Sequence, residues 1–217
     1  MSIVIIVLIA ASFSLQNFDS VTTLENTPDI ILTNVDYFER IPSDLPIVGI
    51  SDAPVTIFAF NDYQCLSCKF WYEKEYPKIS ENLIKTNKAN MVFLDAPTFG
   101  NDSILISQAT FCADEQGKYS EYQKTLFSKQ QEIDSWAKLQ QLKDFAMDLN
   151  LNMEKFANCL DSGKYEKDVQ ANIDYTTSMG VEKIPLFKII NFEGKEFVLK
   201  GSIPSTLFEE TVNRFQN

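Results

Sequence analysis

The sequence predicts an α/β fold in which a strand–helix–strand unit and a strand–strand–helix unit are separated by a long, purely helical stretch. The first unit is indicated by apolar runs at residues 55–60 and 90–94, with helical sequence between them. The second is indicated by two further apolar runs, 186–190 and 196–199, followed by an amphipathic segment. Residues 103–179 show a helical pattern throughout, so the expected order is β-α-β, helical block, β-β-α.

Length and composition bound the class of protein. The chain has 217 residues, which fits one domain with an insertion and suffices to bury a core. Its formal net charge of -11 argues against nucleic acid or an anionic membrane surface as a partner. With 17 Phe and 8 Tyr, the chain is also unlike a disordered acidic sequence.

The N-terminus begins with an apolar segment that permits three interpretations. Residues 3–15 carry no charge, are fewer than the roughly 20 residues of a membrane-spanning helix, and are typical of a signal peptide. Residues 1–15 are therefore expected to be a signal peptide or an N-terminal membrane anchor, although no Lys or Arg precedes the apolar run. A buried strand or helix is a further alternative. Residues 16–44 are typical of a polar tether, and the folded domain is expected over 45–217, with its helical insertion at about 101–179.

The elements of the first unit follow one another closely. Residues 52–54, Asp-Ala-Pro, introduce the first core strand at 55–60. A helix is expected over about 67–85, with a kink or break at Pro77, because proline has no N–H to donate and its ring clashes with the preceding turn. A second short strand is expected at 90–94.

Turn residues divide the helical block and the closing unit. The helical block is expected to break at Gln116-Gly117, 132–134, 150–152 and 162–163. Glu193-Gly194 indicates a hairpin between the strands 186–190 and 196–199. A closing helix is expected over 204–215, because Pro204 suits a first helical turn and apolar residues recur on one face.

A CxxC motif, Cys65-Leu66-Ser67-Cys68, lies directly after the first strand and at the start of the expected helix. Unpaired N–H groups and the positive end of the helix dipole stabilise a thiolate at Cys65 in this place. Cys68 lies one turn further along the same face, where the two sulfurs are close enough to form a disulfide. This arrangement indicates thiol–disulfide exchange, with Cys65 and Cys68 as the candidate catalytic residues.

A zinc site is the competing interpretation of a CxxC motif. Zinc takes four Cys or His ligands, whereas this chain has no His and its other cysteines, Cys112 and Cys159, lie in separate helical segments. The ligand count disfavours a metal, and no metal or organic cofactor is expected. Four cysteines, an even number, suit an oxidising compartment and agree with export of the protein.

Several short motifs occur along the chain in a distinctive order. They are Ala-Pro-Val-Thr at 53–56, Asp-Tyr-Gln-Cys at 62–65, Cys-Ala-Asp-Glu-Gln-Gly-Lys-Tyr at 112–119, Cys-Leu-Asp-Ser-Gly-Lys-Tyr at 159–165 and Gly-Val-Glu-Lys-Ile-Pro at 180–185. On these motifs the chain resembles the DsbA-like branch of the thioredoxin superfamily, especially the BdbD-type proteins, from about Leu45 to its C-terminus. The resemblance implies a thioredoxin fold with an inserted all-helical subdomain and a protein thiol–disulfide oxidoreductase.

The resemblance also implies roles for individual residues. Cys65 would form a mixed disulfide with a client protein, and Cys68 would resolve it. The proline matching Pro185 is cis in the family and faces the CxxC motif, and the residue before it, here Ile184, offers backbone hydrogen bonds to the client. Ile184 and Pro185 are thus the expected substrate-binding residues. From the residues alone, a trans proline that ends a loop before the next strand remains the simpler interpretation.

The family pattern further implies a structural disulfide between Cys112 and Cys159, which leaves the CxxC pair free to cycle. Two alternatives stay open. The pair could be a second redox couple that relays electrons to or from Cys65, or two buried free thiols in a reducing compartment.

Two positions depart from the family pattern. Ala59 stands six residues before Cys65, where many relatives have a buried Glu that takes the proton of the resolving thiol, which leaves open what replaces that acid. The dipeptide between the cysteines is Leu-Ser rather than Pro-His, so Cys65 lacks a neighbouring His cation, while Ser67 can still donate a hydrogen bond to its thiolate. Asp62, at the strand end, is expected to accept hydrogen bonds from N–H groups of the turn or helix.

The sequence thus predicts an extracytoplasmic thiol–disulfide oxidoreductase, secreted or tethered to the membrane, that acts on Cys-containing exported proteins as a disulfide-forming oxidase. By resemblance, a membrane redox partner would reoxidise the CxxC pair. Two alternatives remain: a non-catalytic thioredoxin-fold module that binds clients, and a disulfide isomerase or reductase.

Overall fold

The computed structural model describes residues 45–130 and 135–216. The apolar segment 1–15, the tether 16–44 and the expected break at 132–134 lie outside the described residues. Among the helices that are described, none is long and apolar enough to cross a membrane.

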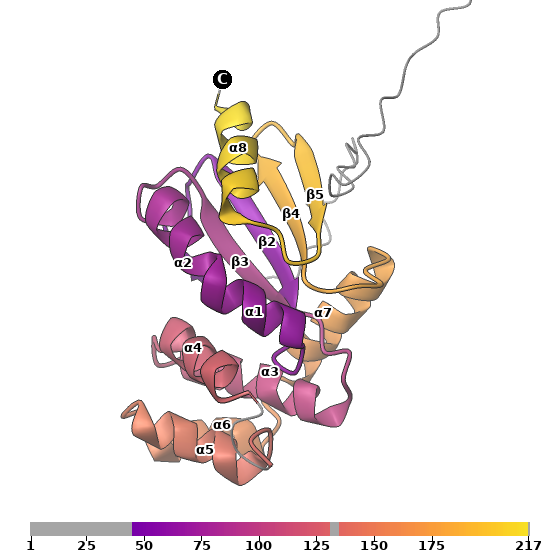
Figure 1. The fold of residues 1–217 in the computed structure, drawn as a ribbon. Coiled ribbons are helices and arrows are strands. Elements are labelled where there is room, and N and C mark those ends of the chain that lie inside the picture. Colours follow the sequence, from indigo (N-terminus) through magenta and orange to yellow (C-terminus); the bar gives the residue numbers. More distant parts are fainter. Residues whose placement is uncertain (1–44, 131–134, 217) are drawn as a thin grey trace, which may run out of the picture.

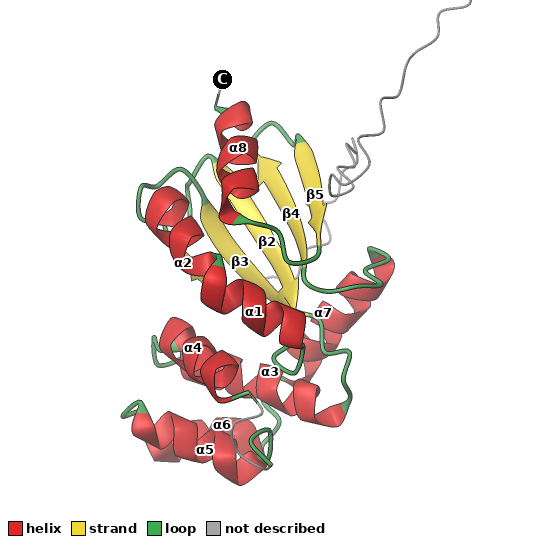
Figure 2. Cartoon of the chain, in the orientation of Figure 1, coloured by secondary structure: helices red, strands yellow, loops and turns green. Residues whose placement is uncertain are grey.

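A five-stranded mixed sheet forms the centre of the molecule (Figures 1 and 2). Its strands are β1 (Ile47–Val48), β2 (Val55–Asn61), β3 (Asn90–Asp95), β4 (Leu186–Asn191) and β5 (Glu196–Lys200), in the spatial order β1-β3-β2-β4-β5. β2 and β3 run parallel, whereas the other neighbouring pairs are antiparallel. The short edge strand β1 has no counterpart in the sequence prediction, because two residues are too few to show a period.

Helices from both ends of the fold cover one face of the sheet, which Figure 1 shows facing the viewer. They are α1 (Leu66–Lys74), α2 (Tyr76–Ile79), the π-helical turn Ser80–Ile84 and α8 (Ser205–Phe215). Instead of one helix over 67–85, the chain forms three pieces, and the first break falls at Glu75 rather than at Pro77 itself. Proline removes the hydrogen bond to the preceding turn, so the helix already ends before the ring.

In the part of the chain that the structure describes, five helices between β3 and β4 form the insertion. They are α3 (Asn101–Asp114), α4 (Tyr119–Lys129), α5 (Leu139–Asp148), α6 (Met153–Asp161) and α7 (Glu166–Ser178). The breaks expected at 116–117, 150–152 and 162–163 all fall between these helices. Figure 1 shows α3 to α6 grouped beyond one end of the sheet, next to α1. The predicted thioredoxin fold with an inserted all-helical subdomain is therefore confirmed.

Alternation along the strands divides the core into two parts. Ile57 and Ala59 of β2 face the layer of α1 and α8, whereas Phe58 and Phe60 face the opposite side, where Tyr175 of α7 stacks on Phe60 with ring centroids 6.2 Å apart. Because successive residues of a strand point to opposite faces, one strand serves both cores. The helical layer is held by aromatic packing, in which Phe187 of β4 contacts the rings of Trp71 and Phe208.

The C-terminal unit agrees with its sequence signals. Between β4 and β5, the side chain of Asn191 accepts hydrogen bonds from the N–H groups of Glu193 and Lys195, and Gly194 has a φ of 78°, which favours glycine. Pro204 directly precedes α8, which buries Phe208 and packs onto β4.

Candidate active site

Cys65 lies where β2 ends and α1 begins, and it caps the helix with its own side chain. The N–H group of Cys68 donates a hydrogen bond to the sulfur of Cys65 across 3.2 Å. A strand that runs into a helix through a tight turn places this sulfur at the helix N-terminus, where N–H groups have no partner within the helix. The sequence placed Cys65 in this position for the same reason.

The surroundings of Cys65 lower the pKa of its thiol to about 6. The largest cause is a hydrogen bond from the thiol of Cys68; a hydrogen bond with the Ser67 hydroxyl, whose oxygen lies 3.1 Å from the sulfur, adds to it against the opposing effect of burial. The direction agrees with the sequence expectation. The main cause differs from the expected one: the hydrogen bond from the neighbouring thiol lowers the pKa of Cys65 more than the helix N–H groups do.

Cys68 lies in the opposite kind of environment. Its side chain is 1% exposed and points into the core under α1. Burial raises the pKa of the Cys68 thiol far above its usual range, and the hydrogen bond that it donates to Cys65 raises it further. The site therefore stabilises the thiolate of Cys65, whereas Cys68 retains its proton.

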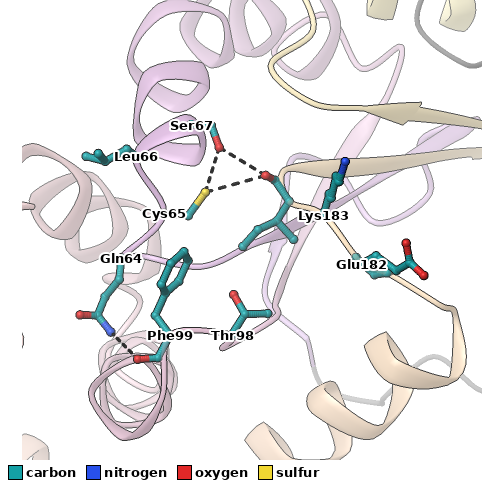
Figure 3. A pocket seen from close by; sticks show the side chains of 10 residues that line it. Gln64, Cys65, Leu66, Ser67, Thr98, Phe99, Glu182 and Lys183 are labelled. Carbon is teal, nitrogen blue, oxygen red and sulfur yellow. Dashed lines mark hydrogen bonds between the residues drawn. The ribbon is translucent and has the colours of Figure 1, made fainter.

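The loop before β4 brings Ile184 next to Cys65, and the peptide bond between Ile184 and Pro185 is cis. The carbonyl oxygen of Ile184 lies 3.9 Å from the sulfur of Cys65, and the hydroxyl of Ser67 donates to the same oxygen across 3.3 Å (Figure 3). Residues 119 positions apart in the sequence are thereby joined at one site. The structure thus brings together the predicted catalytic and substrate-binding residues.

A groove of about 790 Å³ opens in front of Cys65. Its lining comprises Gln64, Cys65, Leu66, Ser67, Thr98, Phe99, Val181, Glu182, Lys183 and Ile184. Figure 3 shows the ring of Phe99 beside the sulfur of Cys65. Leu66 and Phe99 are 58% and 57% exposed, so apolar surface flanks the reactive sulfur.

Sequence reasoning missed Thr98 and Phe99, because nothing in the loop after β3 signals a contact with the CxxC turn. The contact is made by Asp62, which is 2% exposed. Its carboxylate accepts hydrogen bonds from the N–H groups of Thr98 and Phe99 at 2.7 and 3.2 Å. The same carboxylate accepts from the N–H of Gln64 and from the hydroxyl of Ser103, at 2.8 and 2.7 Å. Asp62 therefore has the expected turn contact and, in addition, clamps the groove wall to the CxxC turn.

Cys112 and Cys159 form a disulfide that joins α3 to α6, with an S–S distance of 2.04 Å. Both are buried, at 1% and 5% exposure, and they lie within the insertion rather than at the groove. Ala59 is buried on the face of the sheet that carries α1, so the site has a methyl group at this place. Among the described residues, no group of three or more His, Cys, Asp or Glu side chains could hold a metal ion.

A thiolate-stabilising CxxC turn beside a cis proline on this sheet is the arrangement of a thiol–disulfide oxidoreductase, and comparison with known proteins gives the same class. The protein-family model described as Thioredoxin matches residues 43–197, so the chain belongs to the thioredoxin family.

Similar proteins place the chain more closely within that family. It is 25% identical over 169 residues to the disulfide bond formation protein D of Bacillus subtilis, covering 76% of each chain. The crystal structure of oxidised BdbD from Bacillus subtilis superposes with a TM-score of 0.70 and 24% identity, covering 79% of this chain and 92% of that one. Wolbachia pipientis alpha-DsbA1 superposes with a TM-score of 0.67 and 20% identity over 80% and 91% of the two chains. The predicted class, a DsbA-like thiol–disulfide oxidoreductase, is confirmed.

Proposed function

We propose that the protein is an extracytoplasmic enzyme that introduces disulfides into Cys-containing exported proteins through the Cys65–Cys68 pair. The asymmetry between the two thiols carries this proposal. The pKa of Cys65 is lowered to about 6 and its sulfur faces the groove, whereas Cys68 is buried and its pKa is raised. A thiol with a low pKa is a good leaving group in disulfide exchange, so a mixed disulfide at Cys65 passes readily to the client.

The exchange follows from these positions. In the disulfide form of the enzyme, a client thiolate attacks the sulfur of Cys65, the bond to Cys68 breaks, and a mixed disulfide forms. A second client thiolate then attacks the client sulfur of this mixed disulfide. The client leaves with a new disulfide, and Cys65 departs as a thiolate that its hydrogen bonds stabilise.

The groove supplies the place for the client chain. Ile184, which precedes Pro185 in the chain, forms one side next to the reactive sulfur, and the exposed side chains of Leu66 and Phe99 offer apolar contact around it. An extended segment with a cysteine fits such a groove, because main-chain groups give affinity and side-chain pockets give preference. We assign Ile184 and Pro185 to client binding on this basis.

The proposed location and partners follow from the chemistry. Each client disulfide leaves two electrons on the Cys65–Cys68 pair, so a redox partner at the membrane must reoxidise it. The buried Cys112–Cys159 disulfide is suited to an oxidising compartment, where we assign it a structural role. In this proposal, residues 1–15 export or anchor the protein, 16–44 tether it, and 45–217 form the redox domain.

The test is the oxidation of a reduced, unfolded client by the oxidised protein. The loss of client thiols measures the reaction. The wild-type protein should transfer one disulfide per molecule, and Cys65→Ser should transfer none. A wild-type protein that transfers no disulfide would contradict the proposal and favour a client-binding module, and transfer that survives in Cys65→Ser would contradict the role of Cys65. The direction is decided by the reduction potential of the Cys65–Cys68 couple: a value near −120 mV supports an oxidase, and one near −270 mV a reductase, on the scale of about −120 to −270 mV that such proteins span.

A further inference from the structure

The carbonyl oxygen of Ile184 is an acceptor that the sheet does not use. The next carbonyl, that of Pro185, accepts a hydrogen bond from the main-chain N–H of Gly201 across 2.8 Å. Among the described residues, no main-chain N–H donates to the Ile184 carbonyl. Because β4 begins only at Leu186, this oxygen lies just outside the strand, beside the sulfur of Cys65.

Two side chains of the CxxC motif donate to this oxygen instead. The hydroxyl of Ser67 donates to it across 3.3 Å, and the thiol of Cys65 donates across 3.9 Å (Figure 3). A carbonyl oxygen has two lone pairs, so these two donors fill it. A main-chain N–H is a better donor than a thiol, and its bond to oxygen is usually about 2.7–3.2 Å long. A main-chain N–H that approaches the Ile184 oxygen therefore displaces one of the two side chains.

The hydroxyl of Ser67 has one hydrogen and two acceptors. Its oxygen lies 3.1 Å from the sulfur of Cys65 and 3.3 Å from the oxygen of Ile184. The hydrogen points to one acceptor at a time. When it points to the sulfur it stabilises the thiolate, because hydrogen bonds to a charged acceptor are the stronger ones. Its direction thus depends on whether another donor occupies the carbonyl.

A client chain carries such a donor. When its sulfur reaches Cys65, main-chain N–H groups next to that sulfur come within reach of the Ile184 oxygen, which is 3.9 Å from the Cys65 sulfur. Displacement of the Cys65 thiol removes a bond that only the protonated form makes. Displacement of the Ser67 hydroxyl turns its hydrogen to the sulfur. Both changes favour the thiolate of Cys65.

We propose that Ser67 couples client docking to the ionisation of Cys65, because its hydroxyl and the client main chain compete for the Ile184 carbonyl. The inference rests on the proposed function and adds a control to the same site. When a second client thiolate attacks the mixed disulfide, a bond forms between the two client sulfurs. The bond to Cys65 breaks, and its sulfur keeps the electron pair. Ser67 donates a hydrogen bond to this leaving sulfur and retains its proton.

The coupling distinguishes polypeptides from small thiols. A thiol without a peptide group brings no N–H to the Ile184 carbonyl, so the Ser67 hydroxyl stays there and Cys65 gains no further stabilisation. A docked polypeptide makes Cys65 a better leaving group. Because the coupling is reciprocal, ionisation of Cys65 must strengthen client binding by the same factor by which the client favours ionisation.

The charged groups near Cys65 come from its own turn and from one other loop. Glu182 and Lys183 line the groove from the loop before β4, and the carboxylate of Asp62 lies at the CxxC turn. The lining from the loop after β3 is uncharged. Cys68 of α1 retains its proton, because burial raises its pKa. An uncharged peptide adds no charge to this set, so a change in the titration of Cys65 reports a change in hydrogen bonding.

The decisive experiment measures the pKa of Cys65 in reduced protein by thiolate absorbance, with and without a saturating peptide. The peptide has blocked ends, no ionisable side chain and Ser in place of the client Cys. In the wild type it should lower the pKa of Cys65 from about 6 by about 1. Ser67→Ala leaves one lone pair of the Ile184 carbonyl open and has no hydroxyl to turn, so its pKa should not change. Ser67→Thr keeps the hydroxyl and should keep the shift.

The affinity of the same peptide gives an independent readout. Wild-type protein should bind it about fivefold more tightly at pH 8 than at pH 5, because Cys65 is ionised at the higher pH. Ser67→Ala and the control Cys65→Ala should bind it equally at both. A merely structural role of Ser67 would instead weaken binding by the same factor at each pH.

Matched peptides identify the N–H that competes for the carbonyl. Three peptides are each N-methylated at one position, either the Ser that replaces Cys or one of its two neighbours. Each lacks one donor and keeps its side chains. One of them should bind wild-type protein without lowering the pKa of Cys65.

A covalent form of the test removes any dependence on peptide affinity. In a Cys68→Ala background, a Cys-containing peptide is joined to Cys65 and then released by a small thiol that attacks the peptide sulfur. Release should be about threefold faster than for the matching N-methylated peptide, because a thiol with a lower pKa leaves faster. Addition of Ser67→Ala should remove this difference.

A bound peptide that leaves the wild-type pKa unchanged overturns the inference. So does a shift that persists in Ser67→Ala, or release at equal rates from the two mixed disulfides. Failure of the proposed function has a different signature: oxidised wild-type protein would transfer no disulfide to a reduced client, whatever the pKa of Cys65.

Discussion

The two cysteine pairs of this chain have the same chemistry and opposite surroundings. Cys65 faces a groove, accepts a hydrogen bond from a helix N–H group, and has a pKa lowered to about 6. Cys112 and Cys159 join two helices inside the insertion, with 47 positions between them in sequence, and do not line that groove. Cys65 is 4% exposed and Cys159 5%, so exposure does not separate the pairs. Whether a disulfide reacts or holds the fold together is decided by its position at a groove and by stabilisation of the thiolate, not by the sulfur itself.

The largest expected contrast between the pairs is in activity. Cys65→Ser should reduce disulfide transfer to the uncatalysed rate, because no other thiol at the groove can carry the mixed disulfide. The double variant Cys112→Ser and Cys159→Ser should transfer disulfides within about twofold of wild type at a temperature where it is folded, since its sulfurs lie away from the site. Client thiol loss measures both. If the double variant were inactive while folded, the second pair would be a redox relay.

The next contrast is in stability. Removing the Cys112–Cys159 bridge should lower the free energy of unfolding by about 4 kcal/mol, because the unfolded chain regains the freedom of a loop closed across 47 positions. Urea unfolding of the Cys112→Ala and Cys159→Ala double variant measures this change. In a matched Cys65→Ser and Cys68→Ser double variant, the free energy of unfolding should fall by less, relative to that of the reduced wild type. A larger loss there would reverse the roles assigned to the pairs.

The pairs should also separate by reduction potential. The buried bridge is expected below about −300 mV, whereas the Cys65–Cys68 pair should lie between about −120 and −270 mV. Protein equilibrated with glutathione buffers and then alkylated should therefore be labelled at Cys65 before Cys112 or Cys159. Simultaneous labelling of all four cysteines would remove the distinction between a reactive and a structural pair.

The smallest expected effect sharpens the account of Cys65 itself. Cys68→Ala should raise the pKa of Cys65 from about 6 by about 1, because a hydrogen bond to a charged group contributes about 1.5 kcal/mol or more. Ser67→Ala should raise this pKa by less, since its hydrogen bond is a smaller cause. Thiolate absorbance against pH measures both in reduced protein. A larger effect of Ser67→Ala would assign the leading role to the hydroxyl.

The same pKa sets the sign of a pH effect on the reduced protein. The pKa of Cys65 is lower in the folded than in the unfolded chain, so its thiolate contributes stability above pH 9 that is lost as pH falls towards 6. Urea midpoints of the reduced protein between pH 9 and 6 should decline by more than those of Cys65→Ser. Parallel declines would show that Cys65 does not titrate as described.

Local sequence was sufficient for the elements that hold the reactive sulfur. The apolar run before Cys65 gave a strand, the following residues gave a helix, and the cysteine became its cap. Periodicity and turn residues also located the helices of the insertion and the β4–β5 hairpin. The short strand β1 and the early break at Glu75 were not predicted from the sequence. Two residues show no period, and a proline acts on the turn before it.

Residue types and their spacing are enough to establish the chemistry of the site: a CxxC pair at a helix N-terminus, with no His and no acid at Ala59. The packing of distant segments sets which groups surround that pair. It brought the Ile184 carbonyl to Cys65 across 119 positions and the Thr98 N–H to Asp62 across 36. Strand and helix signals are local properties of the backbone, whereas these contacts arise from the register and packing of segments that carry no mark of one another in sequence.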